Sequence, residues 1–221
     1  MNDVLTMLIL GSAFLALFGI AELLYHRFKV RVEITRKIVH IVTGLITLTF
    51  PVLLNNHWLV LLLCTSFAVI LIVSLKFNLL KSINAIERES VGSICYPIAV
   101  YGCYLAFVYF HHYTNFYLPI LILAICDPIA ALVGKRWPLF PYRVGKDKKT
   151  LMGSSMFLLS ALMLCYFLGV GFERGVDFTF VQVVTIALIA TSAEAVSRRG
   201  YDNITIPAAV LVTWILTDLV R

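Results

Sequence analysis

The stretch FYLPILILAICDPIAALVGKRWPLFPYRVGKDKKTLMGSS, residues 116–155, joins an apolar segment, a basic connection and the start of a second apolar segment. The first apolar segment carries a carboxylate, Asp127. An ionised Asp inside a membrane-spanning helix costs roughly 2.5–3.5 kcal/mol, so Asp127 needs a cationic partner, a metal ion or a water-filled cavity. We interpret the whole stretch as a membrane-spanning helix that leads into a polyphosphate site at the membrane surface.

The connection that follows this segment is strongly cationic. Its lysines and arginines stand against a single acid, Asp147, and Pro138 and Pro141 keep the connection from forming a simple helix. Gly153 and Ser154 then begin an apolar helix, whose free backbone N–H groups are a ready site for an anion. The cations are Lys135, Arg136, Arg143, Lys146, Lys148 and Lys149. These features indicate a metal ion with phosphates, but they also fit an Asp that pairs with a neighbouring helix and lysines that only set the topology.

Composition identifies an integral membrane protein. The chain is 61% hydrophobic and 14% charged, whereas soluble domains are about 45–50% apolar and about 25% charged. The five cysteines lie in apolar segments without CxxC spacing, so neither a disulfide framework nor a zinc site is indicated. The net charge of +6 reflects charge bias in the loops, and we expect no nucleic-acid partner.

The apolar segments predict an all-α, polytopic membrane helix bundle of about eight transmembrane helices, formed by a single domain over residues 1–221. The first segment lacks a basic start and carries Glu22, so we expect it to stay as a span and not to be removed as a signal peptide. The predicted spans are Met1–Tyr25, Ile38–Leu54, Trp58–Leu75, Gly92–Phe110, Phe116–Val133, Leu151–Gly171, Phe180–Val196 and Ile204–Val220.

Lysine and arginine are distributed unevenly between the loops. All of them except Arg174 and Arg221 fall on the loops after the first, third, fifth and seventh spans, the first of these loops being His26–Lys37. Because short cytoplasmic loops carry the excess of Lys and Arg, both termini are predicted to lie on the non-cytoplasmic side. The polar clusters then face the cytoplasm, where nucleoside triphosphates are available.

Two more carboxylates are expected at the same membrane face as Asp127. Glu194 ends the seventh span, and Asp202 and Asn203 precede the eighth. Mg²⁺ is usually held by one or two carboxylates together with phosphate oxygens and water, so a pair among Asp127, Glu194 and Asp202 is a candidate metal site. Asp202 or Asn203 also fits a helix N-cap. Pro207 favours an irregular helix start that lines a cavity.

The segment ITRKIVHIVTG places Arg36 and His40 on one helix face, directed into the membrane from the cytoplasmic edge. A His at this depth can titrate, bind phosphate or bond a neighbouring helix, and we favour the last role. Glu89 lies just before Gly92 in a stretch of mixed charge that is typical of a solvated connection. Arg36, His40 and Glu89 are candidate contacts to substrate or phosphate.

Five segments, in this order, resemble one family: TRKIVHIVTG, ERESVGSICYP, CDPIAALVGKRW, KKTLMGSS and AEAVSRRGYDNITIPAAV. They resemble the CTP-dependent lipid kinases that include dolichol kinase, phytol kinase and the related diacylglycerol and polyprenol kinases. The resemblance covers roughly residues 35–210. It implies a polytopic membrane enzyme that uses Mg²⁺ as cofactor and transfers the terminal phosphoryl group of CTP to the hydroxyl of a lipid alcohol.

The resemblance also implies roles for individual residues. The motif positions Asp127, Ala131 and Gly134 match the family's Asp-containing span, and Pro207 matches its Asp-Asn-x-x-x-Pro element. Catalytic roles fall to Asp127, Glu194, Asp202 and Lys149, with Asp127 and Glu194 as the metal ligands. Gly153, Ser154 and Asn203 match further motif positions of the family, and we assign nucleotide or phosphate contacts to them and, from the basic connection itself, to Lys135, Arg136, Lys146 and Lys148. The chain departs from the family in having Cys126 where the family usually has Gly, and Met152 where it usually has Glu.

Two further expectations and two alternatives concern the reaction. The lipid tail is expected in a groove between spans that opens to the bilayer, and Asp202 either shares the metal or accepts the proton of the lipid hydroxyl. A CTP-dependent cytidylyltransferase acting on a lipid phosphate is the nearest alternative. An anion-binding or transport protein is the alternative from another class. The residues do not specify an oligomeric state.

Overall fold

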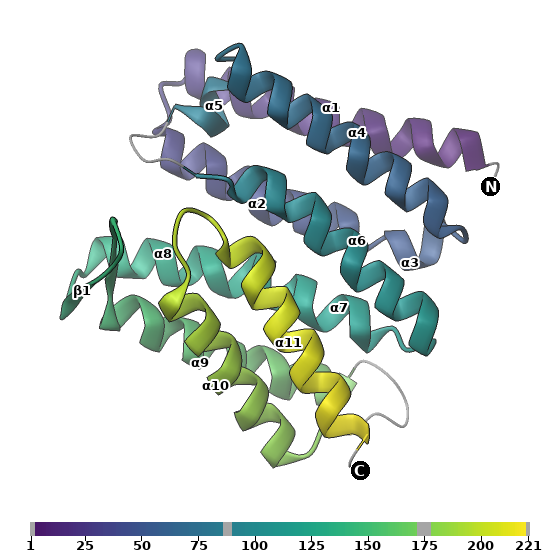
Figure 1. Ribbon diagram of the computed structural model, residues 1–221. Coiled ribbons are helices and arrows are strands. Elements are labelled where there is room, and N and C mark those ends of the chain that lie inside the picture. Colours follow the sequence, from purple (N-terminus) through teal and green to yellow (C-terminus); the bar gives the residue numbers. More distant parts are fainter. Residues whose placement is uncertain (1–2, 86–89, 172–177, 220–221) are drawn as a thin grey trace.

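The computed structural model of the chain describes residues 3–85, 90–171 and 178–219, and it is a bundle of helices with one small hairpin (Figure 1). The prediction of an all-α membrane bundle is confirmed. The elements are α1 (Asp3–His26), α2 (Val32–Thr47), α3 (Phe50–Leu53), α4 (His57–Lys76), α5 (Lys81–Asn84), α6 (Gly92–Phe110), α7 (Thr114–Leu121), the π-helical turn η1 (Ile122–Cys126), α8 (Asp127–Arg136), β1 (Pro141–Val144), β2 (Asp147–Thr150), α9 (Leu151–Gly171), α10 (Phe180–Val196) and α11 (Asp202–Leu219).

Within the described ranges, seven helical segments are long and apolar enough to cross a membrane. One of them is α2 continued by α3, and another is α7, η1 and α8 in succession. The predicted seventh span coincides with α10, which is apolar but only 17 residues long. At about 1.5 Å per residue it is roughly one turn shorter than a hydrocarbon core of about 30 Å. The expected eight apolar helices are therefore present, and one of them is short.

Large apolar side chains cover the outside of the bundle. Leu8, Trp58, Leu62 and Ile98 each expose more than half of their surface. Such a surface would be costly in water but suits contact with lipid tails. The helices α1, α4, α6 and α9 are apolar on all sides, as expected for spans.

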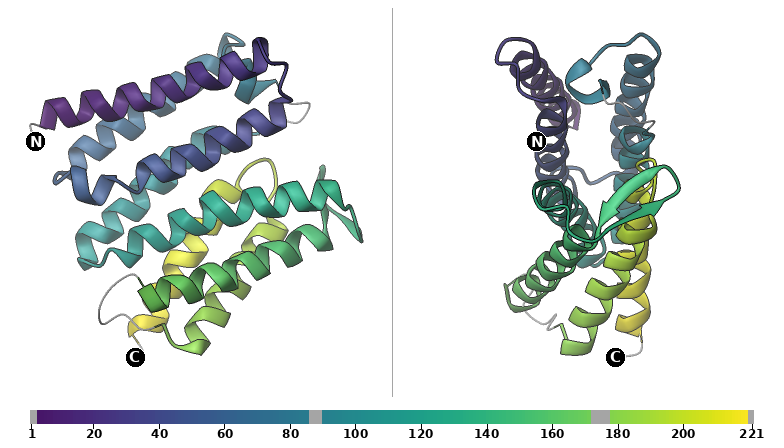
Figure 2. Two further views of the ribbon diagram at one scale, coloured as in Figure 1. Left: turned by 180° about the vertical axis from the view of Figure 1, so that it is seen from behind. Right: turned by 90° about the vertical axis from the view of Figure 1, so that its left-hand side faces the viewer.

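The bundle has two parts joined side by side. The first contains α1, α2, α4 and α6, and the second contains α7 to α11 (Figures 1 and 2). Contacts of α6 with α7 and α11, and of α2 with η1, join the two parts. Both described ends of the chain lie at one end of the bundle, and the hairpin lies at the other (Figure 1). Residues on alternate connections are therefore brought to the same end.

Two of the predicted boundaries are wrong. The segment His26–Lys37 was expected to be a loop, but α2 begins at Val32, so Lys37 lies inside a helix. The fifth span was expected to end at Val133, but α8 continues through Lys135 and Arg136. Lys and Arg are good helix formers, and their long aliphatic stems carry the charge from a helix end to the membrane surface.

The connection before α9 is a β-hairpin where an irregular loop was expected. Strands β1 and β2 pair antiparallel, with Val144 opposite Asp147. Gly145 begins the two-residue turn at φ 61°, a left-handed conformation that glycine adopts at little cost. The Asp147 carboxylate accepts a hydrogen bond of 2.6 Å from the backbone N–H of Arg199, so the hairpin is docked on the turn between α10 and α11.

The π-helical turn η1 interrupts the fifth span directly before Asp127. In a π-helix the carbonyl of residue i bonds the N–H of residue i+5, and the residue five beyond Leu123 is Pro128, which has no N–H. The Leu123 carbonyl is therefore available to another group. The His40 Nε2 atom lies 3.0 Å from it.

Candidate functional site

A polar cavity of about 150 Å³ lies where the helix ends meet the hairpin. Its walls come from α2, α8, β2, α9, α10 and α11, which are distant in the sequence. It collects most of the residues that the sequence singled out, namely Arg36, His40, Asp127, Lys135, Lys148, Lys149, Gly153, Ser154, Glu194, Asp202 and Asn203. The remaining lining residues are Glu33, Lys37, Ala130, Ala131, Gly134 and Thr150.

Three of the candidate residues are not placed in this cavity. Arg136 and Lys146 are exposed and do not line it. Arg136 lies on the last turn of α8, and Lys146 occupies the hairpin turn. Glu89 falls outside the described residues.

Asp127 is paired with a lysine of a neighbouring helix. Lys37 Nζ lies 2.7 Å from Asp127 Oδ2, and His40 Nε2 lies 3.9 Å from the same oxygen. The expectation that Asp127 needs a cationic partner is thus met by α2. The sequence reasoning singled out Arg36 and His40 in this segment but not Lys37, which it counted only among the loop charges. Its position three residues before His40, on the same helix face, was the available signal.

His40 bridges α2 and the fifth span. Because the Leu123 carbonyl can only accept, we assign the ring proton to Nε2, which donates the 3.0 Å hydrogen bond. The predicted role of His40 as a bond to a neighbouring helix is confirmed. The same bond holds α2 against the turn that presents Asp127.

Asp202 joins Asp127 at the cavity. The two carboxylates lie within electrostatic range of each other, and Lys37 and Lys149 act on both of them. The two acids begin different helices, α8 and α11, and the two lysines come from α2 and β2. The site is therefore a compact arrangement of two carboxylates and two ammonium groups, with Lys148 and Lys135 also on the cavity wall.

Glu194 is bonded to Lys149 and to the start of α9. Lys149 Nζ lies 2.6 Å from Glu194 Oε1 and also donates to the Glu194 backbone carbonyl. Ser154 Oγ donates to Glu194 Oε2 at 3.1 Å, and the Tyr142 hydroxyl lies 2.8 Å from Ser154 Oγ. Both carboxylate oxygens of Glu194 are thus engaged. The network ties the hairpin, α9 and α10 together and fixes the position of Lys149.

Asn203 presents a free acceptor. Its side chain is 6% exposed, and its Nδ2 atom donates to the Gly200 carbonyl at 3.3 Å. Its Oδ1 atom is buried and has no hydrogen-bond partner among the described residues. A Cβ atom on Gly92 would lie 2.5 Å from Asn203 Nδ2, so a glycine is needed for α6 to approach this closely. A buried acceptor without a partner is costly, so this atom is open to a hydrogen bond from water or from a ligand.

Part of the expected anion site at the start of α9 is bonded within the protein. The Gly153 N–H donates to Thr150 Oγ1 at 3.1 Å. Gly153 instead allows close packing, since a Cβ atom there would lie 3.0 Å from the Ala130 carbonyl, and one on Gly134 would lie 3.2 Å from Gly153 Cα. A phosphate contact through Gly153 stays a prediction and requires Thr150 to yield its bond.

The chemistry of the donors suits Mg²⁺. The described residues contain no group of three or more His, Cys, Asp and Glu side chains arranged around one point. Mg²⁺ does not require one, because it commonly binds one or two carboxylates and completes its shell with phosphate oxygens and water. Asp127 and Asp202 offer such a pair. Glu194, with both oxygens already bonded, fits this role less well than the sequence suggested.

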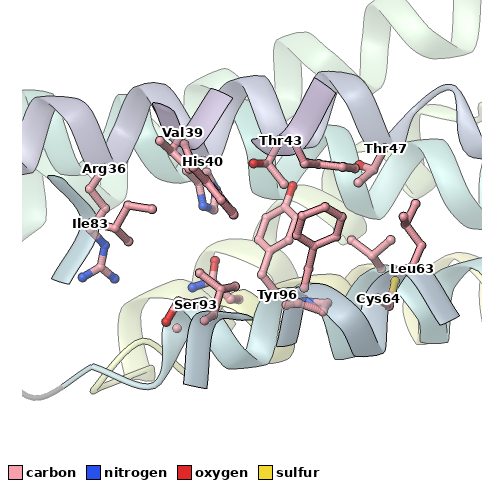
Figure 3. A pocket seen from close by; sticks show the side chains of 18 of the residues that line it. Arg36, Val39, His40, Thr43, Thr47, Leu63, Cys64, Ile83, Ser93 and Tyr96 are labelled. Carbon is pink, nitrogen blue, oxygen red and sulfur yellow. The ribbon is translucent and has the colours of Figure 1, made fainter. Parts of the chain in front are cut away.

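Figure 3 shows an apolar cavity of about 100 Å³. It adjoins the polar cavity, since the two share lining residues. It lies among α1, α2, α4 and α6, and aromatic and aliphatic side chains dominate its walls. Arg36, His40 and Asn203 line both cavities. The two spaces therefore meet at a shared polar boundary.

Fold and site together define a polytopic membrane protein with a cation-rich, carboxylate-bearing cavity at one end of its bundle. The chain is 32% identical over 199 residues to the phytol kinase of Synechocystis sp. (strain ATCC 27184 / PCC 6803 / Kazusa), an alignment that covers 88% of this chain and 84% of that relative. It therefore belongs to the phytol kinase family of lipid kinases. No family model matches the chain, and no solved structure matches it.

Proposed function

We propose that this protein is a lipid alcohol kinase that transfers the terminal phosphoryl group of CTP, with Mg²⁺, to the hydroxyl of a membrane lipid alcohol. One observation carries the proposal: a cavity lined by cations and carboxylates meets an apolar cavity at Arg36, His40 and Asn203. Phosphoryl transfer to a lipid needs a phosphate site and a lipid site that share one boundary. The relative named as a phytol kinase supports the lipid alcohol as acceptor, and the resemblance of the five sequence segments supports CTP.

The cavity cations are the groups that would bind the nucleotide phosphates. Phosphoryl transfer relies on positioning and on neutralising the phosphate oxygens more than on covalent help from the protein. Lys37 and Lys149 now neutralise carboxylates, and an incoming polyphosphate offers them more negative charge than Asp127 and Glu194 do. Lys135 and Lys148, on the cavity wall, add to the positive potential. Arg36 and His40 lie at the boundary with the lipid.

Asp127 and Asp202 would hold Mg²⁺, which when bound supplies further positive charge against the phosphate oxygens. This assignment replaces the pair Asp127 and Glu194. Glu194 would instead position Lys149, because it bonds this side chain through both its carboxylate and its carbonyl.

The lipid hydroxyl would lie at the shared boundary. There Asn203 Oδ1 can accept a hydrogen bond from the hydroxyl as the alcohol enters, and the same proton then passes to an Asp carboxylate at the cavity when the hydroxyl turns toward the phosphate. The hydroxyl oxygen then forms a bond to the terminal phosphorus, the bond from this phosphorus to the bridging oxygen breaks, and CDP leaves. Asp202 is the candidate for the proton acceptor, and if it takes this role Asp127 alone would hold the metal.

The test is a label-transfer assay with purified protein, Mg²⁺ and lipid alcohols such as phytol, farnesol, a polyprenol and diacylglycerol. We expect label from γ-labelled CTP to pass to an alcohol, with release of CDP. Label that passes only from the α position onto a lipid phosphate, with release of pyrophosphate, would establish a cytidylyltransferase instead. Anion flux into proteoliposomes without nucleotide consumption would establish a transporter. The same assay with ATP and GTP tests the choice of CTP.

A further inference from the structure

We propose that the apolar cavity among α1, α2, α4 and α6 binds the tail of the lipid alcohol as a single chain, and that Phe50 and Leu63 at its far end set the tail length. This proposal rests on the proposed function, because it concerns the acceptor of the same reaction. It replaces the groove open to the bilayer that the sequence suggested.

The cavity has a polar mouth and an apolar end. Arg36 lies at one end of the cavity, and Thr47 and Leu63 lie at the other (Figure 3). Arg36 and Asn203 also line the polar cavity, so they mark the end where the two cavities meet. Phe50, which follows α2, is 1% exposed and lines the cavity beyond Thr47. The unpaired Asn203 Oδ1 thus belongs to the mouth, where the hydroxyl has to meet the phosphate.

The length of the cavity corresponds to one leaflet. Arg36 and Thr47 lie on one helix, and at about 1.5 Å per residue their separation along its axis is roughly 16 Å. A bilayer hydrocarbon core is about 30 Å thick, so the cavity spans about half of it. A tail that follows this path ends near the bilayer midplane. A much longer polyprenol would have to pass Phe50.

The walls favour one chain over two. Phe14, Phe50 and Phe67 are buried and pack against one another, with ring centroids 6.3 Å apart for Phe14 and Phe50 and 4.6 Å apart for Phe14 and Phe67. A volume of about 100 Å³ between such closely packed rings leaves no room for two hydrocarbon chains side by side. A two-tailed alcohol such as diacylglycerol would have to leave one tail outside.

A second apolar cavity does not fit the same role. It lies between α1 and α4, and its lining includes Leu15, Glu22, Val69 and Leu80. Although its volume of about 420 Å³ is larger, none of its described lining residues also lines the polar cavity. A tail bound there would not deliver its hydroxyl to the nucleotide.

The kinetic test uses a matched pair of neighbouring leucines on α4. Leu63 is 4% exposed and lines the cavity, whereas Leu62 is 60% exposed on the outer face. We expect Leu63→Trp to raise the KM for phytol at least about tenfold, because each lost 1.4 kcal/mol of tail binding is a factor of ten, and to affect a shorter alcohol such as farnesol less. We expect Leu62→Trp to leave the KM for phytol and the KM for farnesol within about twofold of their wild-type values. Equal effects of the two variants would overturn the proposal.

A second variant acts in the opposite direction and so does not depend on how Leu63→Trp folds. We expect Phe50→Ala to raise kcat/KM for a polyprenol longer than phytol, relative to phytol, by about tenfold or more, because it opens the end wall. An unchanged ratio would contradict the assignment of Phe50 as the end of the site.

A binding readout separates this proposal from the proposed function. A phytol analogue with a photoreactive diazirine at the far end of its tail is irradiated with the wild-type protein in detergent, with and without excess phytol. We expect phytol-protected labelling of the peptides that contain Leu63 and Val100, and none around Val69. This labelling pattern, together with no phosphorylation of any alcohol, would support the tail site and rule out the proposed kinase function. Phosphorylation of an alcohol, together with phytol-protected labelling only around Val69, would support the proposed kinase function and rule out the tail site.

Discussion

At the level of single residues, the pair of Lys37 and Asp127 matters for stability as well as for chemistry. Both side chains are largely buried, with 22% and 12% of their surfaces exposed. Removal of one partner from a buried pair costs about 3–5 kcal/mol, because the other charge stays without compensation. We expect Lys37→Ala to lower the unfolding free energy by this amount, and the double variant Lys37→Ala with Asp127→Ala to recover a large part of it.

The measurement is a double-mutant cycle of unfolding in detergent. The ion pair of Lys135 and Glu33 provides the control, since their side chains are 57% and 48% exposed. Exposed pairs contribute about 0–1 kcal/mol, so Lys135→Ala should have a small effect. A loss of stability in Lys37→Ala no larger than that in Lys135→Ala would show that Asp127 does not depend on Lys37.

The assignment of the metal ligands leads to a second prediction at this level. We expect Asp127→Asn and Asp202→Asn each to lower kcat by about 10²–10³, the usual effect of losing one preorganised electrostatic contact, and to raise the Mg²⁺ concentration needed for half-maximal rate. Glu194→Gln should lower kcat through Lys149 but leave the Mg²⁺ requirement unchanged. Initial rates measured across a Mg²⁺ titration decide the matter. A shifted requirement in Glu194→Gln alone would restore Glu194 as the ligand.

Single residues also show how far sequence reasoning reaches. The cost of a charge in a membrane was enough to single out Asp127 and to require a partner for it. The identity of that partner depends on the packing of α2 against η1, which sequence spacing does not contain. The unpaired Asn203 Oδ1 is likewise visible only once α6 and the turn before α11 are in contact.

At the level of elements, the contact of α8 with α9 depends on two glycines. A Cβ atom on Gly134 would lie 2.7 Å from Thr150 Oγ1, and one on Gly153 would lie 3.0 Å from the Ala130 carbonyl. We expect Gly134→Ala to separate the two helices, which lowers both the unfolding temperature and kcat. Gly102→Ala on α6 is the control, because nothing lies within 4 Å of its Cβ position. It should be neutral or stabilising by up to about 1 kcal/mol. Similar losses in both variants would refute the close-packing role.

The hairpin supplies a further prediction. Asp147 anchors β2 to the turn after α10 through the N–H of Arg199, and β2 carries Lys149 into the site. We expect Asp147→Ala to raise the KM for CTP about tenfold while the KM for the alcohol stays the same, because only the phosphate side of the site is loosened. Asp147→Asn keeps an acceptor oxygen and should retain most of the affinity. Equal losses for the two substrates would argue against a local effect.

The elements differ in how well the sequence predicted them. The spans at Gly92–Phe110, Leu151–Gly171 and Phe180–Val196 coincide with α6, α9 and α10, since a long apolar run bounded by polar residues defines a membrane helix. The hairpin was missed because four-residue strands carry little pattern of their own and gain stability by docking. The π-turn at η1 was missed because it is a small local change inside a helix.

For the whole molecule, the loop charges predict that successive spans cross the membrane in opposite directions. The arrangement of the helices in the structure agrees with this prediction. Residues from the first half of α2, from β2 before α9 and from the first turn of α11 all line the polar cavity. These residues can meet at one end of the bundle only if the helices between them form antiparallel pairs. The predicted order of spans therefore accounts for the assembly of the site, although not for its contacts.

The side of the membrane on which each end lies remains a prediction, and α10 is its critical element. If α10 crosses the membrane despite its 17 residues, the hairpin and the end of α11 lie on opposite sides. The five native cysteines are buried, so single cysteines can be introduced at the exposed positions Lys146 and Leu219 and labelled with an impermeant maleimide. We expect label on Lys146→Cys only from the cytoplasmic side, as the loop charges require, and on Leu219→Cys only from the other side. Labelling of both from one side would mean that the chain between them crosses an even number of times, and that α10 does not span.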